Sequence, residues 1–153
     1  MSLKKSTLER VNITCVNQVV KKFSRSIGLI YDRKLAKNNI TVNQFAILSY
    51  IFYYENIALG KLAVHLAMDR TTLTKNLKPL FRENYIEILH TDDKRMKNIK
   101  LTTLGAQILE NSLELWKEAQ ETIYHTYGKK NIHQLVSLLN EITVRDIENV
   151  VKR

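Results

Sequence analysis

The sequence predicts a mainly α-helical fold with one short β-hairpin and long helices at both ends. Apolar side chains recur at three- and four-residue intervals over most of the chain. After Phe81 this period gives way to two short strand-like segments around a polar turn. One Pro and four Gly occur in 153 residues, of which 44% are hydrophobic, so one domain with helical extensions is expected.

The charge of the chain favours a polyanionic partner. The formal net charge is +9, and the excess lies in residues 1–100, which hold 18 Lys and Arg against eight Asp and Glu. No run approaches the ~20 apolar residues that a membrane helix needs, and no signal peptide is recognisable, so we expect a cytoplasmic protein. The single cysteine, Cys15, excludes an intramolecular disulfide.

We expect one uninterrupted helix from about Ser6 to Ala36. A helix of about 30 residues spans about 45 Å, longer than a domain of this size can cover, so part of it is expected to pack on another chain. Its apolar side chains form two rows, which indicates burial on more than one side. The rows are Val16, Val19, Val20, Phe23, Ile27, Ile30 and Tyr31, and Leu8, Val11, Cys15 and Val19.

A helix over Val42–Tyr54 follows the polar turn Lys37–Ile40. Thr41 and Gln44 have the spacing of a capping box, in which each satisfies a free N–H of the other. The side chains expected to face the core are Phe45, Leu48, Ile51 and Phe52.

Two short helices then form a helix-turn-helix. The first covers Leu59–Leu66, with Leu62, Ala63 and Leu66 facing inward, and the turn is Ala67–Met68. The second lies in Asp69–Tyr85 and is capped by Asp69. Its buried stripe consists of Leu73, Leu77, Leu80 and Phe81.

The opposite side of this second helix suits DNA. It carries hydroxyl groups and cations without a carboxylate, and such groups bind base edges and phosphates. The residues are Thr71, Thr74, Lys75, Lys78 and Arg82.

A hairpin completes a winged helix-turn-helix. Tyr85–His90 and Ile99–Leu101 are predicted strands around Thr91–Asn98, after Asn84, which tolerates the left-handed backbone that ends a helix. We place the DNA-binding domain at 39–102 and a helical dimerisation region at 1–38 and 103–153. The hairpin is basic, since it carries Lys94, Arg95, Lys97 and Lys100.

Two helices are expected at the C-terminal end. The first begins at Thr102 or Thr103 and ends before Gly128. The second is predicted over Ile132–Val151, with Asn131 and Gln134 as a capping pair. Their apolar residues include Leu104, Ile108, Leu115, Ala119, Leu135, Leu138, Leu139, Ile142 and Ile147.

At this point the sequence resembles the MarR family of regulators from about Val11 to Val150. The resemblance rests on ITVNQFAIL, on LAVHLAMDRTTLTKNLKPL and on a D-x-R wing followed by LTxxG, with Asp93, Arg95 and Gly105. The RTTLTKNLKPL run, the Tyr31–Asp32 pair and W-x-x-A-Q at Trp116–Gln120 look like its RTTLTRNL-type branch. Three positions depart from the family pattern, namely Asn84 for Gly, Ala58 for a capping hydroxyl, and Pro79 late in the recognition helix, where it lacks an N–H.

The resemblance implies a homodimer whose terminal helices intertwine and whose two winged helices bind a pseudo-palindromic operator in double-stranded DNA. Arg95 is then expected in the minor groove, with its guanidinium held by Asp93. Without the resemblance, the pair is better interpreted as a solvated ion pair of the hairpin that contributes little. Carried over by position, the residues that contact the major groove or nearby phosphates are Arg70, Thr71, Thr72, Thr74, Lys75 and Lys78, and Lys94 and Lys97 belong to the wing.

Two effector sites are candidates. Regulators of this kind often carry a cysteine in the first helix, so Cys15 is a candidate redox sensor; the alternative is a small buried apolar residue. Aromatic residues are candidates for a cleft that takes a small aromatic ligand, although the same spacing suits a core. They are Tyr31, Tyr50, Tyr54 and Trp116.

The sequence therefore predicts a DNA-binding transcriptional regulator, a repressor released from its operator by a small ligand or an oxidant. The alternative is a winged helix that binds an acidic protein partner. No nucleophile–base pair, phosphate-binding loop or metal-ligand spacing occurs, so we expect neither an enzyme nor a cofactor nor a metal site.

Overall fold

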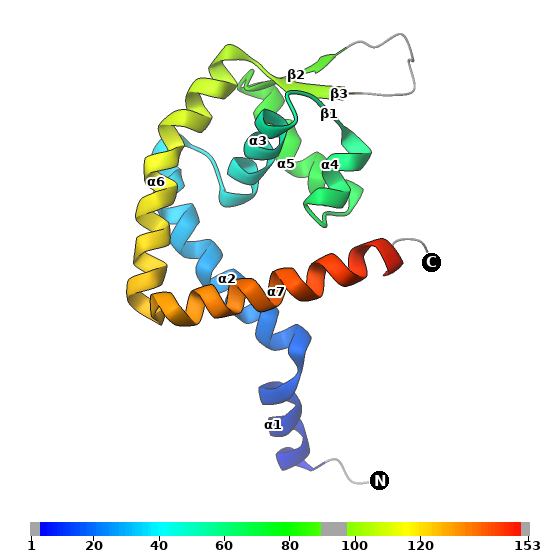
Figure 1. Cartoon of the computed structure of the whole chain (residues 1–153), viewed down its shortest axis with the longest axis vertical. Helices are drawn as coiled ribbons and strands as arrows, with labels where there is room; N and C mark the ends of the chain where they lie inside the picture. The colour runs from blue at the N-terminus through cyan, green and yellow to red at the C-terminus, as the bar shows by residue number, and fades with distance from the viewer. Residues whose placement is uncertain (1–3, 90–97, 151–153) are drawn as a thin grey trace.

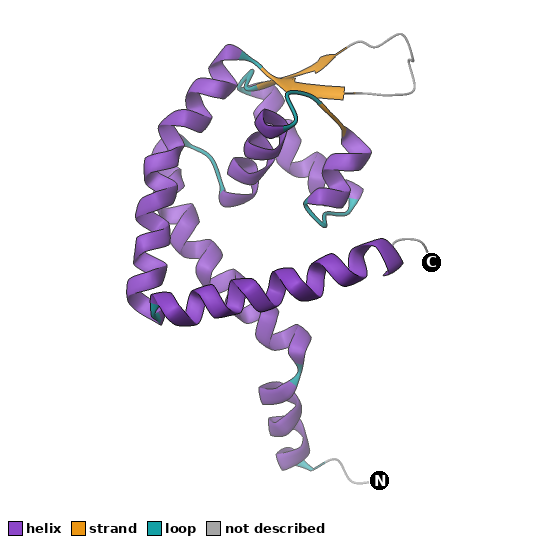
Figure 2. Cartoon of the chain, in the orientation of Figure 1, coloured by secondary structure: helices purple, strands orange, loops and turns teal. Residues whose placement is uncertain are grey.

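The chain folds as a mainly helical winged helix-turn-helix with long helices at both ends, as predicted (Figures 1 and 2). The computed structural model describes residues 4–89 and 98–150. The elements are α1 (Lys5–Thr14), α2 (Val16–Leu35), the 3-10 turn η1 (Ala36–Asn38), α3 (Val42–Tyr53), β1 (Ile57–Ala58), α4 (Leu59–His65), α5 (Arg70–Arg82), β2 (Ile86–Leu89), β3 (Asn98–Leu101), α6 (Thr103–Tyr127) and α7 (Lys129–Val150).

The core forms around α3, which packs on α4, α5, β3 and α6. The predicted capping box begins α3: Gln44 N donates to Thr41 Oγ1 (3.2 Å) and Thr41 N donates to Gln44 Oε1 (2.8 Å). This confirms the helix start. The buried apolar side chains of the winged helix are Ile40, Phe45, Ile47, Leu48, Ile51, Ile57, Leu62, Leu73, Leu77, Leu80, Ile86 and Ile99.

One predicted core residue of α3 is exposed. Phe52 was expected inside but is 64% exposed, whereas Ile47 is fully buried. The buried side of α3 follows Gln44, Ile47, Leu48 and Ile51, at i, i+3, i+4 and i+7, and Phe52 lies at the edge of that stripe. Periodicity alone does not locate this edge.

The hairpin belongs to a three-stranded antiparallel sheet of order β1-β3-β2. The predicted strands β2 and β3 pair with Ile86 opposite Leu101. The first strand, β1, was not predicted; in it Ile57 pairs with Ile99. A strand of two residues is too short to show alternation, so only its tertiary pairing defines it.

The N-terminal helix is broken, so the prediction of one helix over Ser6–Ala36 is wrong at Cys15. The backbone of Cys15 is extended (φ −68°, ψ 107°) and separates α1 from α2. The surrounding run NITCVN, residues 12–17, contains only residues with modest helix propensity. Because α1 projects from the body of the molecule, little packing opposes the break (Figure 1).

The C-terminal helices meet at a tight turn. Gly128 ends α6 with a positive φ of 84°, as predicted. However, α7 begins at Lys129 rather than Ile132, and the Asn131 side chain donates to the Tyr127 carbonyl (3.0 Å) instead of capping α7. Leu104, which shares one side of α6 with Ile108, Leu115 and Ala119 in the predicted pattern, is exposed at the start of that helix.

Apolar side chains are exposed on the helices outside the winged helix. Val16 is 76% exposed and Ile142 is 59% exposed. Among the described residues, no helix is long and apolar enough to span a membrane. Other exposed apolar residues on these helices are Leu8, Val11, Ile13, Val19, Val20, Leu29, Val136, Leu138 and Leu139.

Candidate nucleic-acid interface

Asp69 starts α5 by capping it with both carboxylate oxygens. Oδ1 accepts from Thr72 N (2.8 Å), and Oδ2 accepts from the Thr72 hydroxyl (2.7 Å). These two hydrogen bonds, the hydroxyl first, lower the pKa of Asp69 below its ordinary value. The predicted cap is therefore confirmed, and the charged form of Asp69 is favoured at neutral pH.

The two sides of α5 differ as the sequence predicts. Leu73, Leu77 and Leu80 are buried, and they fix the rotation of the helix about its axis. The outward side chains Arg70, Thr71, Thr74, Lys75 and Lys78 are exposed.

The outward cations of α5 are available to an anionic ligand. Within the described part of the chain, no carboxylate lies in ion-pair distance of Arg70, Lys75 or Lys78. Arg82 at the end of α5 differs, because its Nε donates to Glu83 Oε1 at 2.8 Å. The exposed cations before Arg82 are therefore not neutralised by a neighbouring carboxylate of the described residues and can pair with an external anion.

Two α5 residues have local roles that bear on their predicted DNA contacts. Thr72 is half-buried and its hydroxyl donates to Asp69, so it positions the helix start. The Thr74 hydroxyl donates to the Arg70 carbonyl (2.7 Å) and keeps its lone pairs free for a second donor.

The base of the wing is tied to the helices. Asn84 takes the left-handed conformation (φ 57°), and its carbonyl accepts from the Thr102 hydroxyl (2.7 Å). In the wing strands, Lys100 pairs with Glu87 at 3.0 Å, which reduces its contribution to a basic surface. The predicted contacts Asp93, Lys94, Arg95 and Lys97 lie outside the described residues.

The predicted cleft residues belong to two aromatic clusters. Tyr31 and Trp116 stack with ring centroids 6.5 Å apart. Phe45 also stacks with Trp116, with a centroid distance of 6.4 Å. Tyr50 and Tyr54 instead stack with each other and with His65, at 5.7 and 5.0 Å from the histidine ring.

The Tyr31 hydroxyl is held between α2 and α6. It donates to Gln120 Oε1. Burial, and secondly the nearby Tyr124, raise the pKa of Tyr31. Tyr31 therefore remains a neutral hydrogen-bond donor at physiological pH.

Cys15 is partly buried at the junction of α1 and α2. Among the described residues, no group of three or more His, Cys, Asp and Glu side chains could hold a metal ion.

Sequence reasoning missed Asp32 as a structural residue. Its Oδ1 accepts from Val42 N (2.7 Å) across ten residues of sequence. The only signal was the Tyr31–Asp32 pair, which resembled a branch of the family but gave no partner for the carboxylate.

Comparison with known proteins shows which proteins this chain is similar to. Residues 40–97 match the MarR family. A MarR mutant from E. coli, crystallised with operator DNA, is 25% identical and has a TM-score of 0.76, with 86% of this chain and 96% of that chain covered. MosR from M. tuberculosis in complex with DNA is 27% identical, with a TM-score of 0.68 and coverages of 84% and 98%. A further structure of MosR is 25% identical, with a TM-score of 0.73 and coverages of 88% and 98%.

No curated protein sequence matches the chain. The fold and the basic face of α5 define a winged-helix DNA-binding transcription regulator, a class without enzymatic activity. Within that class, residues 40–97 match the MarR family, and MarR and MosR are similar in structure over most of the chain.

Proposed function

We propose that the protein is a homodimeric repressor that binds a pseudo-palindromic operator. The observation that carries the proposal is the outward face of α5, where Arg70, Lys75 and Lys78 are exposed without a carboxylate partner among the described residues. Cations held in this way gain the most from replacing the counterions of DNA phosphates. The E. coli and M. tuberculosis relatives crystallised with DNA support the same partner here.

The exposed apolar residues of the terminal helices support a dimer. Val16 and Ile142 belong to rows that the chain leaves open to water. A second copy that covers them would remove a large apolar area from water, which stabilises an obligate dimer. In this arrangement the two α5 helices are held about one DNA turn, ~34 Å, apart.

Release follows from the same geometry. Any effector that changes the separation of the two α5 helices lowers operator affinity, since both must reach successive major grooves together. We propose a small aromatic ligand at the Tyr31–Trp116 cluster or an oxidant at Cys15 as the signal. The RTTLTKNLKPL run supports placement of the chain in the RTTLTRNL-type branch of the family.

The proposed contacts are tested by the salt dependence of DNA binding. Lys78→Ala is expected to weaken binding of a fluorescent duplex, and the slope of log affinity against log salt should become shallower by about one. Lys117→Ala is the matched control, because Lys117 is also exposed but lies on α6 beside Glu114 (2.7 Å). Equal slopes for wild type, Lys78→Ala and Lys117→Ala would contradict the contact.

The wing is tested in the same assay. We propose that Arg95 enters the minor groove and that Asp93 orients it, so Arg95→Ala should lower operator affinity and discrimination at A·T-rich positions. Asp93→Asn should give a smaller loss, since the guanidinium remains but is less constrained.

The two effector proposals need separate experiments. Trp116 is the only tryptophan in the sequence, so its fluorescence reports binding of phenolic compounds to the Tyr31–Trp116 cluster. A response that Tyr31→Leu abolishes and Tyr54→Leu preserves would support that site. For the thiol, peroxide should release DNA from wild type but not from Cys15→Ser; equal release from both would exclude a redox role.

A further inference from the structure

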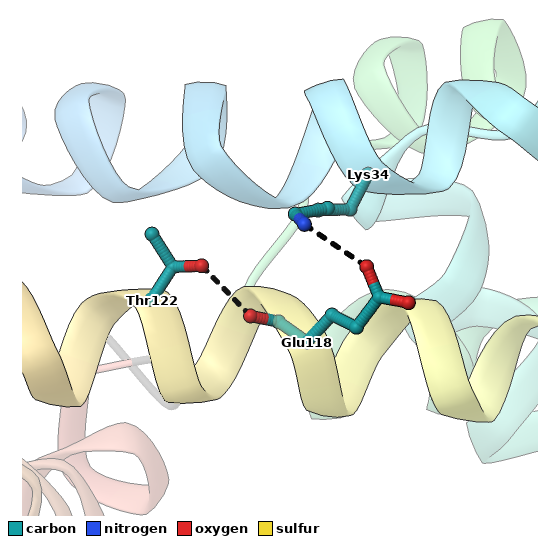
Figure 3. Close-up of polar contacts among 3 residues, drawn as sticks. All are labelled: Lys34, Glu118 and Thr122. Atoms are coloured by element: carbon teal, nitrogen blue, oxygen red, sulfur yellow. Dashed lines mark hydrogen bonds and ion pairs between the residues drawn. The ribbon is translucent and has the colours of Figure 1, made fainter.

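The last turns of α2 form polar contacts with two different parts of the molecule. Tyr31 of α2 donates to Gln120 of α6. Lys34 of α2 also pairs with α6, since its Nζ lies 2.9 Å from Glu118 Oε2 (Figure 3). Asp32 lies between them in sequence but contacts α3, where its Oδ1 accepts from Val42 N at 2.7 Å. Asp32 therefore connects the α2–α6 pair to the winged helix.

Asp32 accepts a hydrogen bond from the first backbone N–H of α3. Val42 is the first residue of that helix, so its N–H has no partner within the helix. A carboxylate is well suited to this place, because it meets the positive end of the helix dipole and accepts a short, charge-assisted hydrogen bond. The helix already has its own cap in the Thr41–Gln44 box. Asp32 therefore adds a link between helices to an end that is capped without it.

The orientation of α3 determines that of α5. The two helices pack directly on each other, and Leu73, Leu77 and Leu80 of α5 lie in the same core as Ile47, Leu48 and Ile51 of α3. A core packed in this way moves as a unit rather than bending continuously. We therefore expect a change in the position of Val42 to be transmitted through this core to α5.

We propose that Asp32 is a positioning residue that sets the angle between the α2–α6 helices and the winged helix, and thereby the operator spacing that a dimer accepts. The inference rests on the proposed function, in which two copies bind two half-sites. Each base pair between the half-sites rotates one relative to the other by about 35° and moves it by about 3.4 Å. A dimer with a fixed angle between its parts therefore discriminates between spacings, and a dimer with a loosened angle does not.

The test compares spacing preference among matched variants. An operator selected from random duplexes with the wild type is remade with one base pair inserted or removed between its half-sites. Asp32→Ala is expected to bind the original operator about tenfold more weakly, because a loosened dimer holds the matching angle only part of the time, while its affinity for the altered spacings changes little. Asp32→Asn keeps an oxygen acceptor and should retain most of the wild-type preference.

Thr41→Ala is the control for loss of capping alone. It removes the hydroxyl that accepts from Gln44 N at the same end of α3 but leaves the link to α2 in place. A residue with a merely structural role would lower the melting temperature without changing the spacing profile, and this is the result expected for Thr41→Ala. Where Asp32→Ala does not fold, Asp32→Glu moves the carboxylate by one methylene and should also flatten the profile.

Two outcomes separate this proposal from the proposed function. A wild-type protein that binds all spacings equally would contradict the proposal that a dimer binds two half-sites together. A wild type that discriminates, together with an Asp32→Ala profile of the same shape, would overturn the role of Asp32 alone. Equal flattening by Thr41→Ala would likewise overturn it, because any damage to α3 would then suffice.

Discussion

Gly105 lies so close to the backbone of Tyr85 that a β-carbon on Gly105 would be 1.9 Å from the Tyr85 carbonyl oxygen. That oxygen also accepts from Thr102 N (3.1 Å). The first turn of α6 is thus packed directly on the residue that precedes β2, which supports the base of the wing. Glycine is therefore required at this position of the LTxxG motif for a steric reason.

Gly105→Ala is expected to destabilise the protein by about 2–3 kcal/mol, because the added methyl group meets backbone and cannot be accommodated by a side-chain rotation. Urea unfolding followed by circular dichroism at a fixed protein concentration measures the change.

Gly60→Ala is the control for the glycine prediction. No atom lies within 4 Å of a β-carbon at Gly60, and the residue is inside α4. It should be neutral or stabilise the protein by up to about 1 kcal/mol, as alanine favours helix. Equal behaviour of the two variants would show that the contact with Tyr85 relaxes without cost.

Tyr31→Phe is expected to cost about 1 kcal/mol, because Gln120 Oε1 loses its donor while α2 and α6 stay packed. The cost depends on pH. Burial raises the pKa of Tyr31 above its ordinary value of 10.0, so the neutral hydroxyl is favoured in the folded state. The resulting stability is complete below that value and is lost as pH rises through the folded-state pKa.

Urea midpoints of wild type and Tyr31→Phe, measured from about pH 8 to about pH 11, should therefore converge at the alkaline end. Tyr53→Phe is the matched control, because the Tyr53 side chain is 77% exposed. A difference that stays constant with pH would contradict the buried, neutral donor.

Asp69→Asn is expected to lose stability at neutral pH and little at acidic pH. Hydrogen bonds from Thr72 lower the pKa of Asp69 below its ordinary value of 3.8. For a lowered pKa, the stability is present above the unfolded-state value and is lost as pH falls through the folded-state value. The gap between the two proteins should therefore close at acidic pH in urea titrations.

Thr72→Val separates the two hydrogen bonds in this cap. It removes the hydroxyl donor but keeps the backbone N–H, so it should reproduce part of the Asp69→Asn effect. If the Asp69→Asn gap did not vary with pH, the charge of the cap would be irrelevant to stability.

Ile142→Asp is expected to produce monomers. The side chain is 59% exposed on α7, so a carboxylate there is tolerated by the isolated chain, but its burial against a second copy is costly. Sedimentation velocity at several concentrations measures the assembly. Val64→Asp, at a 47% exposed position on α4, should leave it unchanged. A dimeric Ile142→Asp would exclude this part of α7 from the interface.

Features encoded within a few residues were predictable from the sequence. The Thr41–Gln44 box, the Asp69 cap, the left-handed Asn84 and the end of α6 at Gly128 all occur as predicted. Each depends on a side chain and a backbone group no more than four residues away, so the local sequence contains both partners. The break at Cys15 also had a local signal in the NITCVN run, but the long apolar rows outweighed it.

The sequence by itself determined a winged helix whose α5 presents cations and hydroxyls outward, because helical periodicity assigns those residues to one side. Only the tertiary structure decided that β1 joins the sheet at Ile99, that Phe52 lies outside the core, and that Asp32 holds the start of α3. Each of these depends on where a second element lies in three dimensions. The pattern of one segment cannot specify that position, since packing of the whole core sets it.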